Sequence, residues 1–173
     1  MNRLFFFLFS LFLVACGDDD EASGGGDNNF FDDYFISFNV SGSESGSYEG
    51  YSDVYQEGEI LIIFGTDDPT LIAQTFSLKF IQNESNENGL NLQTGVYDIE
   101  DIDINGTGYS VLFENISTGA KYGRNGAQGS INITEVTDMY IEGTFNFTAP
   151  SLDNPNEESI SVSSGAFKSL INY

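Results

Sequence analysis

Apolar and polar residues alternate with a period of two over much of the chain from Phe30 onward. Ile36, Phe38 and Val40 share one face, and the residues between them are polar. This pattern is typical of strands that bury one side of a sheet. The run 60–64 is apolar throughout and predicts a central strand covered on both faces. Helical periodicity is almost absent from this part of the chain.

Turn signals separate the alternating runs. Asn105-Gly106, for example, is a strong hairpin signal. The runs predict strands over residues 34–40, 48–55, 60–64, 75–82, 95–99, 109–113, 120–122, 129–134, 140–149 and 160–167. Roughly nine or ten short strands without a helix predict an all-β fold, either an antiparallel β-sandwich or a flattened barrel. The strand spacing does not choose between these two.

The N-terminus carries a separate signal. An apolar stretch of 11 residues, Leu4–Val14, follows Arg3 and is interrupted only by a serine. A membrane span needs roughly 20 residues, so this length fits the h-region of a secretory signal instead. Leu13-Val14-Ala15-Cys16 resembles the lipobox of bacterial lipoproteins, which implies cleavage before Cys16 and lipidation of its thiol. Acyl chains such as palmitate would then hold the protein on a membrane, because each buried CH₂ contributes about 0.8 kcal/mol.

Acidic and glycine residues follow the cysteine at once, in the segment Gly17–Asp27. Such a segment has almost nothing apolar to bury and predicts a flexible tether. We therefore expect a signal peptide at 1–15, a lipidated tether at 16–29 and a single β domain at 30–173. A cysteine followed by an acidic run also resembles the export signal of surface lipoproteins in Bacteroidota. It implies an outer-membrane anchor on the cell surface; the alternative is the periplasmic face.

Charge and residue usage exclude several functions. The chain has 27 acidic and 5 basic residues, and loss of Arg3 with the signal leaves a side-chain charge of −23. Nucleic-acid binding depends on Lys and Arg neutralising phosphates, so no nucleic-acid partner is expected. Histidine is absent and Cys16 is the only cysteine. Ser-His-Asp and Cys-His catalysis and imidazole or thiolate zinc sites are therefore excluded.

The C-terminal half has a family resemblance. Its pattern is Gly129-x-Ile131-x-Ile133-Thr134, then Ile141-x-Gly143-Thr144-Phe145-x-Phe147, then Ile160-x-Val162-x-x-Gly165-x-Phe167. This pattern resembles uncharacterised Bacteroidota lipoproteins with an all-β domain, and Gly95-Val96-Tyr97 is similar to the middle of that domain. The shared motifs are strand patterns, so the resemblance implies a fold and a location and carries over no active site.

One acidic stretch matches half of a calcium loop. Asp101, Asp103 and Asn105 follow the pattern D-x-[DN]-x-[DN]-G, and hard oxygens are what calcium prefers. An EF-hand is rejected, because its loop position 12 is Leu112 and no helices flank it. A looser site using Asp98 with these three residues remains possible, so calcium is the one cofactor considered. The alternative is that these side chains form the polar outer face of a hairpin.

Two further groups of residues are candidates for chemistry. Paired carboxylates can hydrolyse glycosides without histidine, but nothing in the sequence marks one pair. Tyr51 and Tyr55 share strand parity and can stack on sugar rings, whereas Tyr48 falls on the other face. We expect a lipid-anchored, non-enzymatic envelope protein that binds or scaffolds a glycan or a protein partner. A calcium-assisted carbohydrate-binding module is the alternative, and a carboxylate-dependent glycoside hydrolase is less favoured. The sequence leaves the oligomeric state open.

Overall fold

The computed structural model describes residues 33–57, 60–83, 92–100 and 108–172. It is all-β, as predicted, and contains ten strands. They are β1 (Phe35–Gly42), β2 (Gly46–Glu57), β3 (Ile60–Thr66), β4 (Phe76–Asn83), β5 (Gly95–Ile99), β6 (Ser110–Asn115), β7 (Ala120–Gly123), β8 (Gln128–Val136), β9 (Tyr140–Pro150) and β10 (Ser159–Ile171). Each corresponds to one predicted strand, although β10 continues four residues beyond Phe167. Nowhere in the described ranges is there a helix long and apolar enough to cross a membrane.

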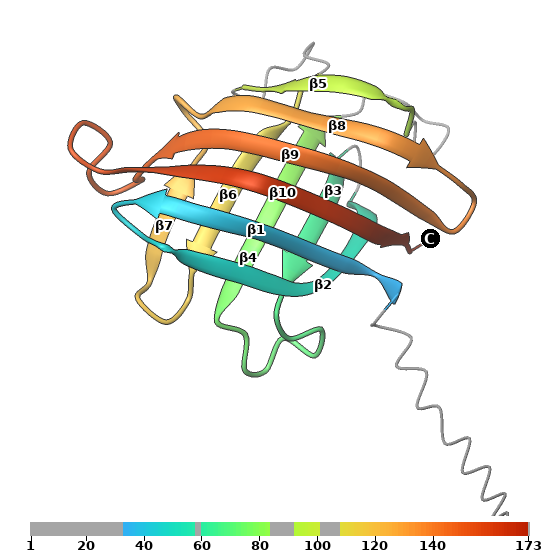
Figure 1. Cartoon of the computed structure of the whole chain (residues 1–173), viewed down its shortest axis with the longest axis horizontal. Helices are drawn as coiled ribbons and strands as arrows, with labels where there is room; N and C mark the ends of the chain where they lie inside the picture. The colour runs from blue at the N-terminus through green and yellow to red at the C-terminus, as the bar shows by residue number, and fades with distance from the viewer. Residues whose placement is uncertain (1–32, 58–59, 84–91, 101–107, 173) are drawn as a thin grey trace, which may run out of the picture.

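The ten strands form one continuous sheet in the order β5-β8-β9-β10-β1-β2-β3-β4-β6-β7. The sheet curls into a half-barrel. Figure 1 shows β5, β8, β9, β10, β1 and β2 crossing in front of β3, β4, β6 and β7 at a steep angle. The bend lies between β2 and β3, so two halves of one sheet face each other like the layers of an orthogonal sandwich.

Strand β2 changes partner along its length. It pairs with β1 as far as Phe35, which opposes Tyr51. Beyond that point β10 lies beside β2 in parallel, with Leu170 opposite Asp53 and Ile171 opposite Val54. The backbone N–H of Asn172 extends this contact by donating to the Val54 carbonyl at 2.9 Å. The end of β10 is thereby fixed against the middle of β2.

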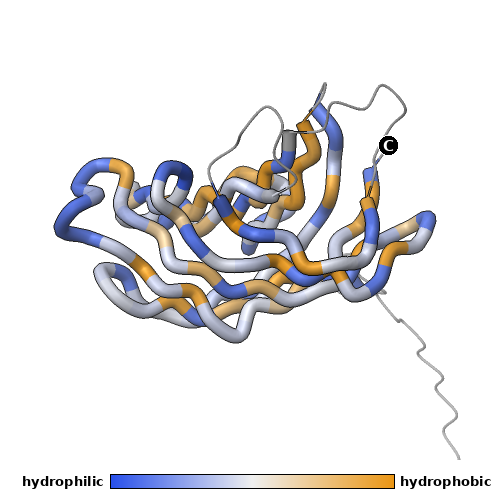
Figure 2. Tube along the Cα trace, turned by 90° about the horizontal axis from the view of Figure 1, so that it is seen from above, coloured by the Kyte–Doolittle hydropathy of each residue, from blue (hydrophilic) through white to orange (hydrophobic). Residues whose placement is uncertain are grey.

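The inner face of the curled sheet holds the core. The predicted apolar faces of β1, β4, β6 and β9 all point there. Figure 2 shows the curl of the sheet and the alternation of hydrophobic and hydrophilic residues along its strands. Phe38 lies at the centre, 5.2 Å from the ring of Tyr48 and 5.8 Å from that of Phe145. The largest fully buried side chains are Tyr109, Phe76, Phe80, Phe113, Phe167, Ile36, Leu61, Ile63, Leu78, Ile131, Ile133 and Ile141.

Strand β3 is buried on both faces, as its continuous apolar run predicts. Leu61 and Ile63 belong to the core, whereas Ile62 and Phe64 lie on the outer face and are still only 7% and 9% exposed. Lys79 of β4 lies over the Phe64 ring, 5.6 Å from its centroid. Neighbouring side chains thus cover the outer side of β3.

Strands β5 and β6, which flank the Asn105-Gly106 turn signal, do not pair with each other. Strand β5 pairs with β8, and β6 pairs with β4 and β7. The described residues on either side of that turn signal meet at a parallel bridge between Ile99 and Tyr109, and the rings of Tyr97 and Tyr109 lie 5.5 Å apart. A local turn preference is weaker than the burial that each strand gains elsewhere in the sheet. The turn residues themselves lie outside the described ranges.

Candidate functional site

Strand β10 contains one irregularity, at Ser163–Gly165. Between Val162 and Gly165 it has one residue more than the facing segments of both β1 and β9, which makes this a β-bulge. Ser164 occupies the bulge with φ of 54°, a left-handed conformation that is uncommon for a residue other than glycine. Bulges of this kind occur beside binding sites, where they redirect a side chain.

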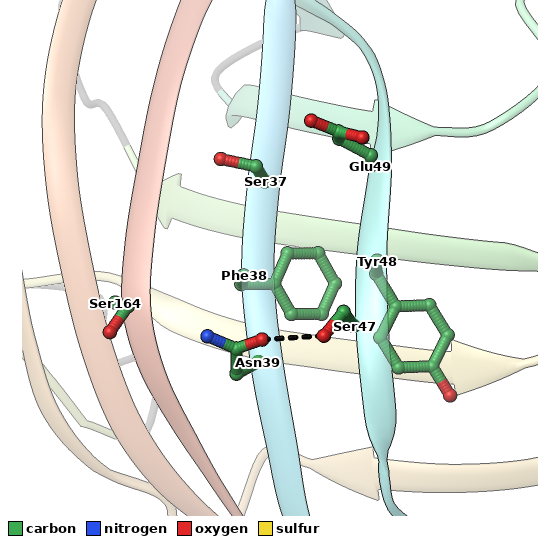
Figure 3. Close-up of a pocket in the computed structure, with 7 residues that line it drawn as sticks. All are labelled: Ser37, Phe38, Asn39, Ser47, Tyr48, Glu49 and Ser164. Carbon is green, nitrogen blue, oxygen red and sulfur yellow. Dashed lines mark hydrogen bonds between the residues drawn. The ribbon is translucent and has the colours of Figure 1, made fainter.

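A hollow of about 250 Å³ lies at this bulge, over β1 and β2 (Figure 3). Its polar residues come from the outward positions of the two strands, and Ser164 closes one side. The Ser47 hydroxyl donates to Asn39 Oδ1 at 2.7 Å across the strand pair. Phe38 and Tyr48 alternate with these residues, and their rings stack on each other. The lining is Ser37, Phe38, Asn39, Ser47, Tyr48, Glu49 and Ser164.

The hollow presents hydrogen-bonding groups to solvent. Three serine hydroxyls and one amide can donate and accept hydrogen bonds, and one carboxylate can accept them. A serine nucleophile needs an adjacent base, and the chain has no histidine to provide one. The hollow therefore has no serine–histidine pair, and its groups can orient a polar ligand.

The outward row of β2 continues beyond the hollow with Tyr51, Asp53 and Tyr55. Asp53 opposes Phe64 of β3 and Leu170 of β10, so its neighbours across the sheet are apolar. Burial raises the pKa of Asp53 from 3.8 to about 6, and the hydrogen bond from Asn172 offsets only part of this effect. Burial and the nearby Asp53 carboxylate also raise the pKa of both tyrosines.

The carboxylate of Asp53 is incompletely paired. Its Oδ2 accepts a hydrogen bond from Asn172 Nδ2 at 3.2 Å. Its Oδ1 is buried and has no hydrogen-bond partner among the described residues. Unpaired buried polar atoms are rare in proteins, and they cluster where a ligand or a proton is handled.

The loop between β3 and β4 presents a second kind of surface. Leu71 and Ile72 are 55% and 87% exposed at its tip. The Asp68 carboxylate accepts hydrogen bonds from the backbone N–H groups of residues 70, 72 and 73 at 2.7–3.1 Å. Asp67 in turn accepts bonds from the backbone and hydroxyl of Thr75. These bonds lower the pKa of both carboxyl groups; at Asp67 they outweigh the opposing effect of burial. The loop is therefore held in one shape.

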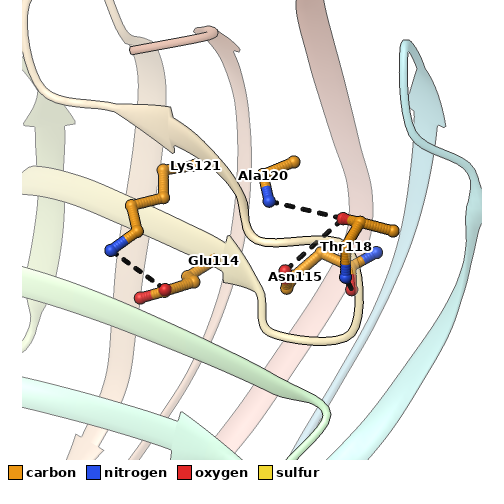
Figure 4. Close-up of polar contacts among 5 residues, drawn as sticks. All are labelled: Glu114, Asn115, Thr118, Ala120 and Lys121. Carbon is orange, nitrogen blue, oxygen red and sulfur yellow. Dashed lines mark hydrogen bonds and ion pairs between the residues drawn. The ribbon is translucent and has the colours of Figure 1, made fainter. Parts of the chain in front are cut away.

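The turn between β6 and β7 carries a further group of polar contacts (Figure 4). Lys121 Nζ lies 3.0 Å from Glu114 Oε1, directly across the strand pair. Asn115 Nδ2 donates to Glu44 Oε2 at 2.9 Å, and the Thr118 hydroxyl donates to Glu44 Oε1 at 3.2 Å. Glu44 thus joins the β1–β2 turn to the β6–β7 turn, which indicates a structural role for this group.

The structure leaves the predicted calcium site largely untested. Asp98 lies on the edge strand β5 with an exposed side chain. Asp101, Asp103 and Asn105 lie outside the described residues, as does the predicted lipidation residue Cys16. Across the described ranges, no three Asp, Glu, His or Cys side chains come close enough together to hold a metal. Calcium binding remains an expectation from sequence.

The prediction that Tyr51 and Tyr55 share one face of the strand and Tyr48 lies on the other is confirmed. The sequence analysis did not point to Asp53. Tyr48 packs against Phe38 and Phe113 on the core side, whereas Tyr51 and Tyr55 lie with Asp53 on the outer face. The run Tyr-Ser-Asp-Val-Tyr could have indicated Asp53, because it places an acid between two aromatic residues on the same face of the strand. The contacts that desolvate it come from β3 and β10, far away in sequence.

Comparison with known proteins gives a family and no precedent for the site. No curated protein matches the chain, and no solved structure does. A family model described as a domain of unknown function, DUF6252, matches residues 49–170. The match begins inside β2 and ends one residue before the end of β10, so it includes Asp53, both of its tyrosine neighbours and the bulge. This protein belongs to the DUF6252 family.

Proposed function

We propose that this protein is a lipid-anchored envelope protein, attached through Cys16, whose β domain binds a ligand or partner without catalysing a reaction. The lipobox-like residues Leu13–Cys16 and the acidic tether support the anchor and an outer-membrane location, with the domain facing the cell exterior. The resemblance of the C-terminal strands to Bacteroidota lipoproteins supports the same location.

The observation that carries the binding role is the hollow at the β10 bulge. A strained residue, Ser164, is held where hydroxyl, amide and carboxylate groups from three strands converge. Strained conformations persist where surrounding structure imposes them, and they are concentrated at ligand sites. A polar hollow without a nucleophile–base pair suits a neutral, hydroxyl-rich ligand such as a sugar of the envelope.

The binding role is tested by filling the hollow. The full chain in detergent is screened by thermal melting against neutral and acidic envelope oligosaccharides. Ser47→Trp places an indole in the hollow, and Ser41→Trp, on the exposed outer side of β1 beyond it, is the matched control. We expect a glycan to raise the melting temperature of the parent and of Ser41→Trp but not of Ser47→Trp. Equal shifts in both variants, or no shift with any glycan, would reject the hollow as the glycan site.

The anchor is tested separately in cells. Cys16→Ser removes the thiol that lipidation requires, so we expect an unprocessed precursor that incorporates no labelled palmitate. Ser23→Cys, combined with Cys16→Ser, restores a thiol at the wrong position and serves as the control. Normal processing of Cys16→Ser would exclude the lipobox interpretation and leave the binding role unaffected.

A further inference from the structure

A carboxylate without a counter-ion lies on the outer face of β2. Asp53 Oδ1 is buried without a hydrogen-bond partner among the described residues, and Oδ2 receives one bond, from Asn172. Within the described ranges the only ion pair is the one between Lys121 and Glu114, so Asp53 has no basic partner there. A desolvated charge of this kind is stabilised strongly by a cation.

The surroundings of Asp53 are aromatic and apolar. Tyr51 and Tyr55 stand on either side of it along the strand, each about 7 Å away by strand geometry. Phe64 and Leu170 flank it across the sheet. Asp53 itself is only half-buried, and the hydrogen bond between its Oδ2 and Asn172 is exposed, so a ligand can reach Oδ2 from solvent.

Aromatic rings on this face already hold ammonium groups. Lys79 Nζ lies 5.6 Å from the centroid of Phe64, and Lys168 Nζ lies 4.3 Å from that of Tyr140. The faces of such rings attract cations through their quadrupoles, and the attraction grows when the cation is partly desolvated. Lys79 lies on β4 opposite Phe64, Lys168 lies on β10 two residues before Leu170, and neither forms an ion pair with Asp53.

We propose that Asp53, Tyr51 and Tyr55 form a binding site for an alkylammonium group. The ammonium would donate hydrogen bonds to the carboxylate, while the two phenol rings contact its flanks. The ammonium would donate to Oδ2, which accepts only one hydrogen bond, from Asn172, and its charge would compensate the unpaired Oδ1 of the same carboxylate. The alkyl part of the ligand would lie against Phe64 and Leu170.

Charge favours an ammonium over a sugar at this position. A hydroxyl leaves the carboxylate charge unneutralised, whereas an ammonium neutralises it and also interacts with the rings. The formal charge of −22 raises the local concentration of cations around the whole molecule. This site is separate from the hollow, and its test uses different variants, so one proposal can fail while the other stands.

Butylammonium chloride is the minimal probe, with sodium chloride at equal ionic strength as the reference. We expect butylammonium to raise the melting temperature of the full chain by about 3 °C at concentrations well above its Kd. Asp53→Asn should abolish the rise. Asp153→Asn, the same change at an exposed acid in the β9–β10 loop, should retain it. Tyr55→Leu should weaken binding several-fold. A rise that persists in Asp53→Asn, or one that sodium reproduces, overturns the proposal.

Two further arms complete the experiment. Binding should be weaker at pH 5 than at pH 7, because the Asp53 carboxyl, with a pKa of about 6, is mostly protonated at the lower pH. Equal binding at both pH values contradicts a carboxylate ligand.

The second arm uses Nα-acetyl-lysine amide, in which the side-chain ammonium is the only amine. It distinguishes a lysine side chain of a protein partner from a free amine as the source of the ammonium group. Tighter binding than butylammonium indicates a lysine side chain of a protein partner, and equal binding indicates a free amine. Binding of neutral oligosaccharide at Asp53 instead of either amine also overturns the proposal.

Discussion

The inner face of the curled sheet is filled by aromatic and aliphatic side chains, whereas the outer face of β2 carries hydroxyl, carboxylate and phenol groups in succession. The inner face buries its members almost completely, with Phe145 at 3% and Phe167 at 0% exposure. The outer face leaves Asp53 with an unpaired oxygen and Ser164 in a strained conformation. Stability is concentrated on one side of the sheet, and the features that reduce it lie on the other. Binding features commonly reduce stability in this way.

The test with the largest expected effect on stability removes an aromatic ring from the core on the inner face. Phe145 contacts the rings of Phe38, Phe80, Phe147 and Phe167. Phe145→Ala should lower the free energy of unfolding by about 3–5 kcal/mol, because it removes buried area and leaves a cavity. Denaturant titration measures the change.

The matched control for Phe145 is an apolar residue outside the core. Val96, on the edge strand β5, is 69% exposed, and Val96→Ala should change the free energy of unfolding by less than about 0.5 kcal/mol. Comparable losses in the two variants would contradict the assignment of the core to the inner face.

A second test uses the one polar pair inside the core side of β2 and β10. Ser52 and Ser169 are both fully buried, and their hydroxyl oxygens lie 2.6 Å apart. Ser52 also donates to the Phe64 carbonyl at 2.9 Å, so Ser169 must be the donor between the two serines. Ser52→Ala should cost about 1–3 kcal/mol by leaving the Ser169 hydroxyl without its acceptor.

The double variant of these serines shows whether they act as a unit. Ser52→Ala with Ser169→Ala should cost less than the sum of the single changes, because neither hydroxyl is then left unpaired. Thermal or denaturant unfolding of all four proteins completes the cycle. Strict additivity would mean that the two hydroxyls do not depend on each other.

The third test concerns the outer face and predicts a gain in stability. The folded-state pKa of Asp53 is about 6 against 3.8 for the free side chain. The folded protein therefore binds this proton more tightly, and its stability falls as the pH rises from about 4 to about 6. At pH 7, Asp53→Asn should stabilise the protein by about 1 kcal/mol, a value reduced from the full shift because the residue remains partly exposed.

The pH profile separates this effect from a general gain. The difference between Asp53→Asn and the parent should be near zero below pH 4 and fully developed above pH 6. Thermal melts across that range measure it. A difference that does not change with pH would mean that the proton on Asp53 is not its cause.

The strands of both faces could be predicted from the sequence, because period-two alternation depends only on near neighbours. The bulge is also visible in the sequence. In Ile160-x-Val162-x-x-Gly165, the inward positions Val162 and Gly165 are three residues apart instead of the two that a regular strand requires. The desolvation of Asp53 could not be predicted, since it depends on Phe64 and Leu170, which the sheet order brings beside it. For the same reason the Asn105-Gly106 signal did not predict the partners of β5 and β6, which pair with β8 and with β4 and β7.

The smallest expected effect comes from the outer-face ion pair of Lys121 and Glu114. The two side chains are 47% and 27% exposed, so solvent screens the attraction that their 3.0 Å separation provides. Lys121→Met should therefore change the free energy of unfolding by less than about 0.5 kcal/mol. Asn115→Ala, one residue from Glu114, removes the 2.9 Å bond to Glu44 that joins two turns, and should cost about 1 kcal/mol. A larger loss from Lys121→Met than from Asn115→Ala would show that outer-face charge contributes to stability. Stability would then no longer belong mainly to the inner face.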